Sequence, residues 1–305
     1  MEQANRKEST MKRMAYVFVI SAAVLWGTIG IYSNQLSQYG ANVLQIVSIR
    51  AIFAALAIFV FILLKDRRLL NIDIHDWKYF FGTGILSFVF FNWCYFIAIN
   101  KTTLSTAAIL LYTAPAIVMV LSIILFKEKL TGRKVAALIL TFIGCAFVTA
   151  VVKGRQNISP LGILAGLGSG LGYALYSIFG RYALKKYDPI TVTLYTFVFA
   201  SIGLIPISDI KGLFCLLSNT GALCNAVLLG LIATVLPFLL YTKGLSYLET
   251  SKASIIATVE PVVATVIGII LFGEPITIYK IIGIFLVVFA VSILEQKKEN
   301  IQESL

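Results

Sequence analysis

Ten apolar runs, each about twenty residues long, follow one another between Met14 and Leu294. A run of that length, folded as a helix, crosses the hydrocarbon core of a bilayer. Of the 305 residues, 59% are hydrophobic and 13% are charged, roughly half of the charged share usual for a soluble domain. A lipid-exposed segment must satisfy its backbone hydrogen bonds internally. The sequence therefore predicts an all-α membrane protein.

The runs predict ten transmembrane helices joined by short loops, with no separate soluble domain. We expect the spans near residues 14–33, 43–64, 77–99, 104–126, 134–152, 160–182, 190–207, 222–246, 252–272 and 277–294. Residues 14–152 and 160–294 then hold five spans each. Residues 1–13 and 295–305 are expected to form polar tails at the two ends.

The basic residues predict the orientation of the chain. A formal charge of +11 could indicate a nucleic-acid-binding protein, but Lys and Arg lie in short loops rather than on one folded face. Counting them by side gives 19 on the side that carries both chain ends and 6 on the other. The positive-inside rule then places both termini in the cytoplasm of a cell (plasma or inner) membrane, and an even number of spans is consistent with that.

The chain also resembles itself at an offset of 146 residues. Between Tyr95–Lys134 and Tyr241–Lys280, 13 of 40 positions are identical without a gap. The aligned pairs are not only apolar: they include Pro115 with Pro261, Glu128 with Glu274, Thr131 with Thr277 and Lys134 with Lys280. An apolar composition alone does not align Pro, Glu, Thr and Lys together.

This offset predicts two inverted five-helix repeats. Five is an odd number, so the second copy enters the membrane from the opposite side. Inverted repeats are a recurrent architecture of transporters, with the substrate site near mid-bilayer where the halves meet. Two similar halves can exchange roles, which favours alternating access. The alternative is a duplication that only built a stable bundle.

Several longer segments carry a family resemblance. They are "VLWGTIG" from Val24, "SIRAIFAALAIF" from Ser48, "YFIAINKTTLSTAAILLYTAP" followed by "LFKEKLT", and in the second half "YALYSIFGRY" and "YLETSKASIIATVEPVVATVIGIILFGEPIT". With these segments the chain resembles the drug/metabolite transporter superfamily, in particular its EamA-like ten-span group, over about residues 14–295. The resemblance implies transport, often outward, of amino acids, other metabolites or nucleotide derivatives.

Glu260 lies inside the ninth predicted span, directly before Pro261. A carboxylate at membrane depth is costly unless it is paired, hydrated or protonated. We expect either a functional group, sensitive to protons or facing a substrate ammonium, or a structural carboxylate paired with a cation. Lys243 is the candidate partner, unless it extends to water instead. The first-half counterpart of Glu260 is Ala114, so any role of this charge breaks the symmetry.

Aromatic and amide side chains recur in the spans of both halves. Aromatic faces can hold an ammonium or an apolar group, while hydroxyls and amides orient polar ends. The candidates for lining a substrate cavity, besides Glu260, are Trp26, Asn92, Tyr95, Tyr112, Tyr173, Tyr176 and Tyr241. The alternative for each is packing or placement at the membrane interface, where Tyr and Trp are frequent.

Pro115 and Pro261 occupy matched positions and predict matched interruptions. Each removes one backbone hydrogen bond from its helix and permits a kink. They are expected to act as hinges for alternating access, or else as fixed bends.

Three further features leave their roles open. Gly162, Gly166 and Gly170 recur every four residues, which permits close helix packing within the chain or in a dimer. Glu128 and Glu274 follow helix ends in matched loops, where they are expected to cap a helix or to pair with Lys. Arg50, near the start of the second span, is expected either to extend toward water or to brace a gate.

These features favour a transporter over an enzyme or a scaffold. We find no nucleophile motif, phosphate loop or metal-ligand cluster, no CxxC pair among the four cysteines, and hence expect no cofactor and no metal. The expected partners are a small-molecule substrate, membrane lipids and protons, without nucleic acid, in a monomer or homodimer. An amino acid or amine-bearing metabolite is favoured, with export by alternating access. Uptake of a cationic nutrient, drug efflux, and a non-transporting scaffold or sensor are the alternatives.

Overall fold

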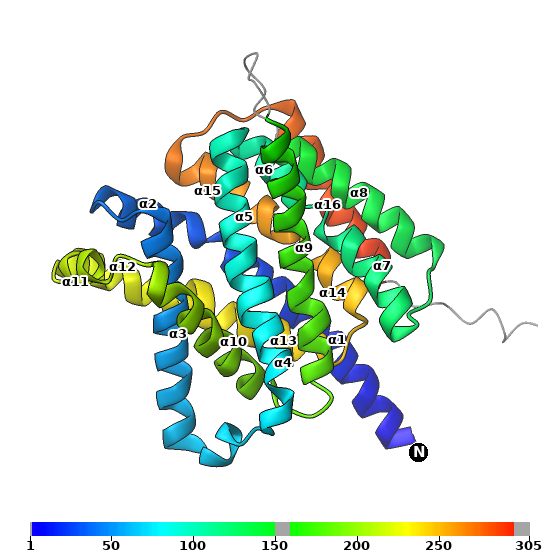
Figure 1. Ribbon diagram of the computed structural model, residues 1–305. Helices are drawn as coiled ribbons and strands as arrows, with labels where there is room; N and C mark the ends of the chain where they lie inside the picture. Colours follow the sequence, from blue (N-terminus) through cyan, green and yellow to red (C-terminus); the bar gives the residue numbers. More distant parts are fainter. Residues whose placement is uncertain (1, 150–158, 296–305) are drawn as a thin grey trace, which may run out of the picture.

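A computed structural model describes the backbone of residues 2–149 and 159–295, with side chains from Thr10 onward. The described residues form a bundle of helices without strands (Figure 1). The α-helices are α1 (Glu2–Gly27), α2 (Ile29–Gln38), α3 (Val43–Lys65), α4 (Trp77–Phe81), α5 (Phe90–Lys101), α6 (Leu104–Leu111), α7 (Ala114–Phe126), α8 (Gly132–Thr149), α9 (Pro160–Ala183), α10 (Pro189–Leu204), α11 (Ile210–Leu217), α12 (Thr220–Gly230), α13 (Leu236–Leu245), α14 (Thr250–Ile256), α15 (Val259–Phe272) and α16 (Ile278–Glu295). Short 3₁₀ or π segments are η1 (Arg67–Leu70), η2 (Ile74–Asp76), η3 (Gly82–Val89), η4 (Ile205–Ile207) and η5 (Leu231–Val235).

Ten helical segments of the described chain are long and apolar enough to cross a membrane. This confirms the predicted fold class. The second and fourth are Val43–Lys65 and Leu104–Phe126, close to the predicted 43–64 and 104–126. The first is longer than predicted, Thr10–Gln38, because only Thr28 separates α1 from α2. Residues 150–152 of the predicted fifth span and 296–305 of the predicted tail lie outside the described residues.

Helix α11 was not predicted. It lies between the seventh and eighth spans, buries Leu213 and Leu216, and exposes Phe214. One apolar face against the bundle and one open face are typical of a helix that lies at a membrane surface.

Two matched spans are broken in mid-membrane, directly before a proline. In the fourth span the N–H of Thr113 donates to Leu110 O, and in the ninth the N–H of Thr258 donates to Ile255 O, three rather than four residues back. Pro115 and Pro261 cannot continue the earlier hydrogen-bond pattern, and a proline is well tolerated in the first turn of a helix. Helices α7 and α15 therefore restart inside the bundle, with the positive ends of their dipoles there.

The third and eighth spans share another irregularity. Each contains a π-helical segment, η3 and η5. Shifted by the repeat offset, η5 matches residues 85–89 inside η3. The repeat therefore extends to local backbone geometry, at segments of the kind that often lie beside functional sites.

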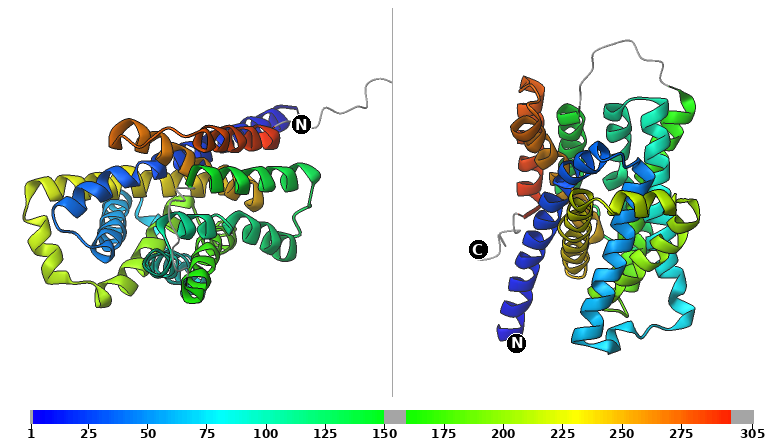
Figure 2. Two further views of the ribbon diagram at one scale, coloured as in Figure 1. Left: turned by 90° about the horizontal axis from the view of Figure 1, so that it is seen from above. Right: turned by 90° about the vertical axis from the view of Figure 1, so that its left-hand side faces the viewer.

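The two ends of the described chain lie at the same face of the bundle, since the Tyr16 hydroxyl donates to Leu294 O at 3.0 Å. We call this the amino-terminal face, and the other the opposite face. The loop 127–131 lies at the amino-terminal face, whereas its repeat mate, the loop 273–277, lies at the opposite face (Figures 1 and 2). The repeats are thus inverted, as the odd number of helices between matched positions requires.

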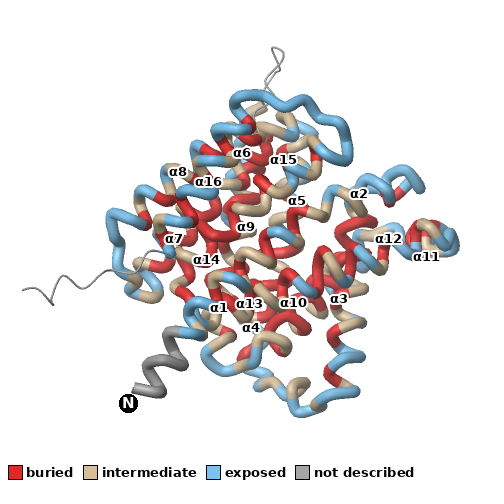
Figure 3. Tube along the Cα trace, turned by 180° about the vertical axis from the view of Figure 1, so that it is seen from behind, coloured by how far each residue is buried: buried red, intermediate tan, exposed pale blue. Residues whose placement is uncertain are grey.

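Buried residues gather along the bundle interior, while the outward faces of the spans are exposed (Figure 3). Many exposed side chains are large and apolar, as Leu64 at 83% and Ile270 at 72% illustrate. Such a surface requires a lipid environment.

Glycines allow the closest helix contacts. The stripe Gly162, Gly166 and Gly170 of α9 lies against Thr102, Leu110 and Thr113 of the first repeat, so it packs within the chain. Gly144 of α8 and Gly283 of α16 face each other, and a Cβ built on Gly283 would lie 2.7 Å from Gly144 O. This contact joins the fifth and tenth spans, one from each repeat.

We predict that Gly283→Ala destabilises the protein by about 1–3 kcal/mol, because an added methyl group meets backbone that cannot move aside. Thermal unfolding in detergent, followed by tryptophan fluorescence, measures the effect. Gly180→Ala is the matched control, because its nearest neighbour is Leu245 Cδ2 at 3.5 Å. Equal stability of the two variants would show that the α8–α16 contact is not tightly packed.

Candidate functional site

A cavity lies between the two repeats near the middle of the bundle. About 70 Å³ of it can hold the centres of water-sized molecules, and the space not filled by protein atoms, which includes space open to solvent, is about 570 Å³. The first repeat lines it with Trp26, Ile29, Arg50, Ser87, Phe88 and Phe91, and the second with Tyr173, Tyr176, Ser177, Phe238, Tyr241 and Glu260. Apolar and aromatic walls surround one acidic and one basic side chain.

Glu260 is fixed by the restart of α15. It occupies the first turn of that helix, where the helix dipole favours a negative charge. The Tyr173 hydroxyl donates to Glu260 Oε2 at 3.3 Å, which is the only side-chain hydrogen bond of this carboxylate among the described residues. The half-buried carboxylate therefore presents its remaining acceptor capacity to the cavity.

Arg50 is the basic side chain of the cavity, and the sequence left its role open. It is buried, with 8% of its surface exposed. Its Nε donates to Thr234 Oγ1 at 3.3 Å, and its guanidinium lies 5.4 Å from the centre of the Phe88 ring. Phe88 and Thr234 are repeat mates, one in η3 and one in η5. The two π-helical segments thus hold one arginine between them.

Hydroxyl pairs order the aromatic wall of the second repeat. Tyr176 bonds to Thr242 and Tyr241 bonds to Ser177, each at 2.6 Å between oxygens. Trp26 packs against Tyr241, with ring centres 5.3 Å apart. Because the buried hydroxyls are paired with each other, these rings form a fixed and largely apolar surface.

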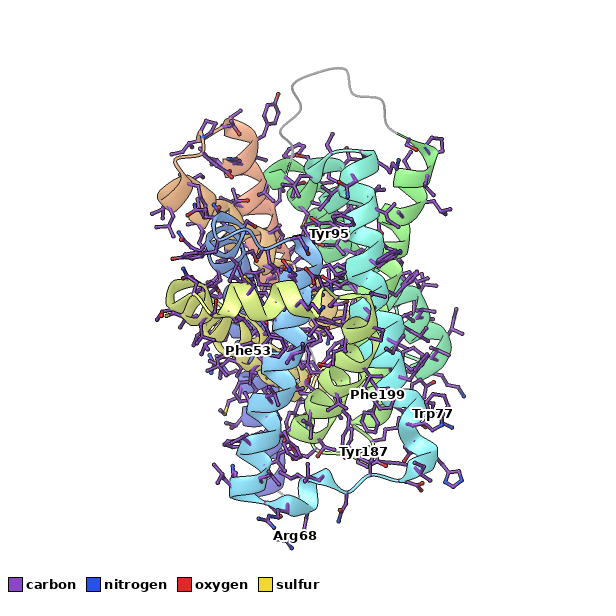
Figure 4. All side chains as sticks on the ribbon, turned by 60° about the vertical axis from the view of Figure 1, so that its left-hand side comes forward. Phe53, Arg68, Trp77, Tyr95, Tyr187 and Phe199 are labelled. Carbon is purple, nitrogen blue, oxygen red and sulfur yellow. The ribbon has the colours of Figure 1, made fainter. Side chains whose placement is uncertain are left out.

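Of the eight candidate lining residues, five line this cavity: Trp26, Tyr173, Tyr176, Tyr241 and Glu260. Asn92 instead donates to Phe88 O of its own helix and lines an apolar groove formed with α3 and α10. Tyr95 packs on Phe91 toward the opposite face (Figure 4). Tyr112 lines a small adjoining void with Pro115 and Tyr173. The structure therefore does not bring these three into the central cavity.

Lys243, the candidate partner of Glu260, lies elsewhere. Its Nζ is 5.4 Å from the centre of the Tyr247 ring, and no ion pair joins it to Glu260 in the described structure. Its ammonium group lies beside Tyr247 instead. Among the described residues, no cation is in direct contact with Glu260.

A cluster at the amino-terminal face joins the two repeats, and we call it the amino-terminal lock: Glu128, Lys134, Glu249, Thr250 and Ser251. Glu128 accepts a hydrogen bond from the Thr250 N–H at 2.6 Å, one from the Ser251 N–H at 3.3 Å, and one from the Ser251 hydroxyl. A carboxylate of the first repeat thus caps α14 of the second. Helix N-termini leave such N–H groups free for an outside acceptor.

Lys134 compensates the acidic charges of the lock. Its Nζ lies 3.4 Å from Glu128 Oε2 and 3.2 Å from Glu249 Oε2, and its side chain is 2% exposed. Burial alone would raise the pKa of Glu249, but its ion pairs with Lys252 and Lys134 lower that pKa. A lowered pKa stabilises the lock at neutral pH, and this contribution is lost as the pH falls.

The fold and the site together define a class of protein: a polytopic membrane protein whose inverted repeats enclose a central cavity, as in secondary transporters. The described residues contain no group of His, Cys, Asp and Glu that could hold a metal ion. The chain belongs to the EamA-like transporter family, whose model matches residues 13–150 and 160–295, one match for each repeat.

The relatives carry the names of transporters. A protein of Archaeoglobus fulgidus named an uncharacterized transporter is 30% identical over 269 residues, covering 87% of this chain and 90% of its own. The uncharacterized inner membrane transporter YicL of Salmonella typhimurium is 26% identical, covering 93% and 95%. A solved crystal structure matches with a TM-score of 0.78 at 16% identity, over 93% of this chain and 96% of its own, which supports the fold.

We predict that Lys134→Met lowers the free energy of unfolding by about 3–5 kcal/mol, because it leaves the buried carboxylate of Glu128 without a cation. Thermal unfolding in detergent measures the loss. The matched control is Lys280→Met at the repeat mate, whose partner Glu274 is 49% exposed, so that the loss stays below about 1 kcal/mol. Equal losses would contradict the difference in burial between the two pairs.

Proposed function

We propose that the protein is a secondary transporter that exports a small amine-bearing metabolite, such as an amino acid, across the cytoplasmic membrane. The observation that carries this proposal is Glu260, a carboxylate in the first turn of a half-helix that lines a cavity shared by both repeats. Among the described residues no cation contacts this half-buried carboxylate, which favours binding of an ammonium group there. Trp26, Tyr173, Tyr176 and Tyr241 then form the surface against which the rest of the substrate packs.

Alternating access provides the mechanism. The inverted repeats can exchange conformations, and Pro115 and Pro261 act as hinges where the fourth and ninth spans are broken. The amino-terminal face is cytoplasmic in this proposal, in agreement with the 19 basic residues counted there from the sequence. The lock at that face then closes the cavity toward the cytoplasm. Export is the direction that the family resemblance implies.

Proton coupling follows from the same carboxylate. A group that holds an ammonium in one state can hold a proton in another, so that substrate leaves as a proton enters. Counterflow with and without an imposed pH gradient separates such antiport from facilitated diffusion.

We predict that Glu260→Gln lowers substrate affinity roughly 10- to 100-fold, because one charge-assisted contact is lost. Counterflow in proteoliposomes, screened over amino acids and amines, measures this. The control is Asp66→Asn, a loop carboxylate at the amino-terminal face. Flux that survives Glu260→Gln unchanged would assign Glu260 a structural role. The absence of flux over a broad metabolite screen would contradict transport of this substrate class.

A further inference from the structure

Two charges of opposite sign line the cavity without touching each other. Arg50 bonds to Thr234 and Glu260 bonds to Tyr173, and within the described chain no direct ion pair joins the two. Both line the same space. Isolated charges at this depth are costly, and a direct ion pair would lower that cost. The protein instead holds them apart through separate partners.

The partners of each charge keep its free side toward the cavity. The Thr234 hydroxyl donates to Leu229 O at 2.9 Å, so a lone pair of its oxygen faces Arg50 Nε. Arg50 Nε is the only atom of its guanidinium with a hydrogen bond to the described residues, which leaves the terminal nitrogens as donors. A planar guanidinium with two free nitrogens matches the geometry of a carboxylate.

We propose that Arg50 binds the carboxylate of the substrate while Glu260 binds its ammonium group, so that the transported molecule is a zwitterionic α-amino acid. This rests on the proposed transport function and narrows its substrate class. The aromatic residues that line the same cavity suit an apolar or aromatic side chain. A simple amine leaves Arg50 unpaired, and a simple acid leaves Glu260 unpaired, so both are rejected.

The test compares leucine and phenylalanine with 3-methylbutylamine and 2-phenylethylamine, which lack only the carboxylate. Competition is measured against the best amino acid found in the counterflow screen. Wild type is expected to prefer the amino acid of each pair roughly 10- to 100-fold. Arg50→Gln removes this preference without weakening the amines, and Arg50→Lys keeps part of it. Lys101→Gln, an exposed basic residue, is the control.

The outcomes separate this inference from the proposed function. If wild type transports the amines as well as the amino acids, Arg50 does not select a carboxylate, while transport of amine-bearing compounds stands. If Arg50→Gln lowers the affinity for amines and amino acids by the same factor, the arginine is structural and the inference is wrong. If neither series competes or is transported, both proposals fail.

A second inference rests on a different observation. The loops 127–131 and 273–277 have similar conformations, but among the described residues only the first contacts the other repeat through its carboxylate. Lys127 and Gly273 are repeat mates, and both end their helices in the left-handed region, with φ of 54° and 65°. Lys134 Nζ donates to Lys129 O at 3.0 Å, and Lys280 Nζ to Pro275 O at 3.1 Å. The loop that carries Glu128 therefore has an almost identical counterpart carrying Glu274.

Only one of these two loops makes a lock. Helix α14 packs against α7 and α8, whereas its mate α6 has no packing of similar extent against α15 or α16 in the described chain. Glu274 is 49% exposed and pairs only with Lys280 among the described residues. The N–H groups of Leu104 and Ser105, the mates of Thr250 and Ser251, have no acceptor in this part of the chain.

Other contacts between the repeats are made at both faces. At the amino-terminal face Tyr195 donates to Leu70 O at 2.7 Å. At the opposite face the hydroxyls of Ser48 and Ser208 lie 2.5 Å apart. The loops of Glu128 and Glu274 thus differ in contact although both faces hold the repeats together, as expected if the contacts of these two loops alternate.

The geometry points to a second lock at the opposite face, in which Glu274 caps α6 at Leu104 and Ser105 when the amino-terminal lock opens. Lys280 Nζ lies 2.8 Å from Glu274 Oε2. This ion pair keeps the carboxylate of Glu274 at the loop that would form the second lock. The two locks are mutually exclusive, so each carboxylate stabilises one of two states of the transporter.

Labelling of a cavity cysteine from the opposite face tests this second lock. Ile29→Cys, in a chain whose four cysteines are replaced by Ser, reports access for a membrane-impermeant maleimide. Glu274→Gln is expected to raise the labelling rate and Glu128→Gln to lower it, each up to roughly tenfold, because each removes a charged cap from one state. An unchanged rate in Glu274→Gln, or a change of the same sign in both variants, would overturn the proposal.

A disulfide provides the independent readout. Ser105→Cys with Glu274→Cys should crosslink when a thiol oxidant is added during transport, and the crosslink should stop flux until a reductant is added. Ser251→Cys with Glu128→Cys, the mates, should crosslink without substrate. If the variant with Ser105→Cys and Glu274→Cys never forms the crosslink while flux continues, the second lock is also overturned.

Discussion

The absence of water within a bilayer is the constraint on which the rest of the structure depends. Each backbone polar group at that depth needs a partner inside the protein, so straight helices are the default. The exceptions lie inside the bundle: the breaks before Pro115 and Pro261, and the π segments η3 and η5. Irregular backbone is tolerated there because neighbouring helices shield it from lipid. The same breaks supply what a binding site requires, namely half-helix ends and side chains directed at a common cavity.

The fold follows from the sequence because its signals are long and repeated. The apolar runs predict the positions of the spans. The paired Pro, Glu, Thr and Lys residues predict a repeat of five helices, and the odd number of helices predicts that the second repeat is inverted. Helix α11 was missed because its eight residues are too few for a membrane span and resemble an apolar loop. The breaks were anticipated as kinks only. A proline indicates where a hydrogen bond is lost, but the tight turn that replaces it depends on tertiary packing.

The site was predictable in part. Glu260 and four aromatic candidates line the central cavity, and their sequence signal is that a charge or a polar ring in a span is exceptional. Asn92 lines a different groove, because a spacing of three residues places two side chains on the same side of a helix but does not say which neighbour that side contacts. An Asn can also satisfy its amide on its own helix, as it does with Phe88 O. The sequence does mark Arg50 as unusual, because it is a basic residue two turns inside an apolar run. The direction of its side chain depends on Thr234, which is distant in sequence.

The two repeats differ where their symmetry would prevent function. Glu260 faces Ala114 in the alignment, so the cavity carries one carboxylate rather than two that would repel each other. Glu128 and Glu274, by contrast, are identical in sequence and unequal in contact. A strictly symmetric structure would close both faces or neither. In the proposed mechanism, two identical locks that cannot close together turn one duplicated loop into two alternative states, while the single carboxylate of Glu260 selects the ammonium group of the substrate.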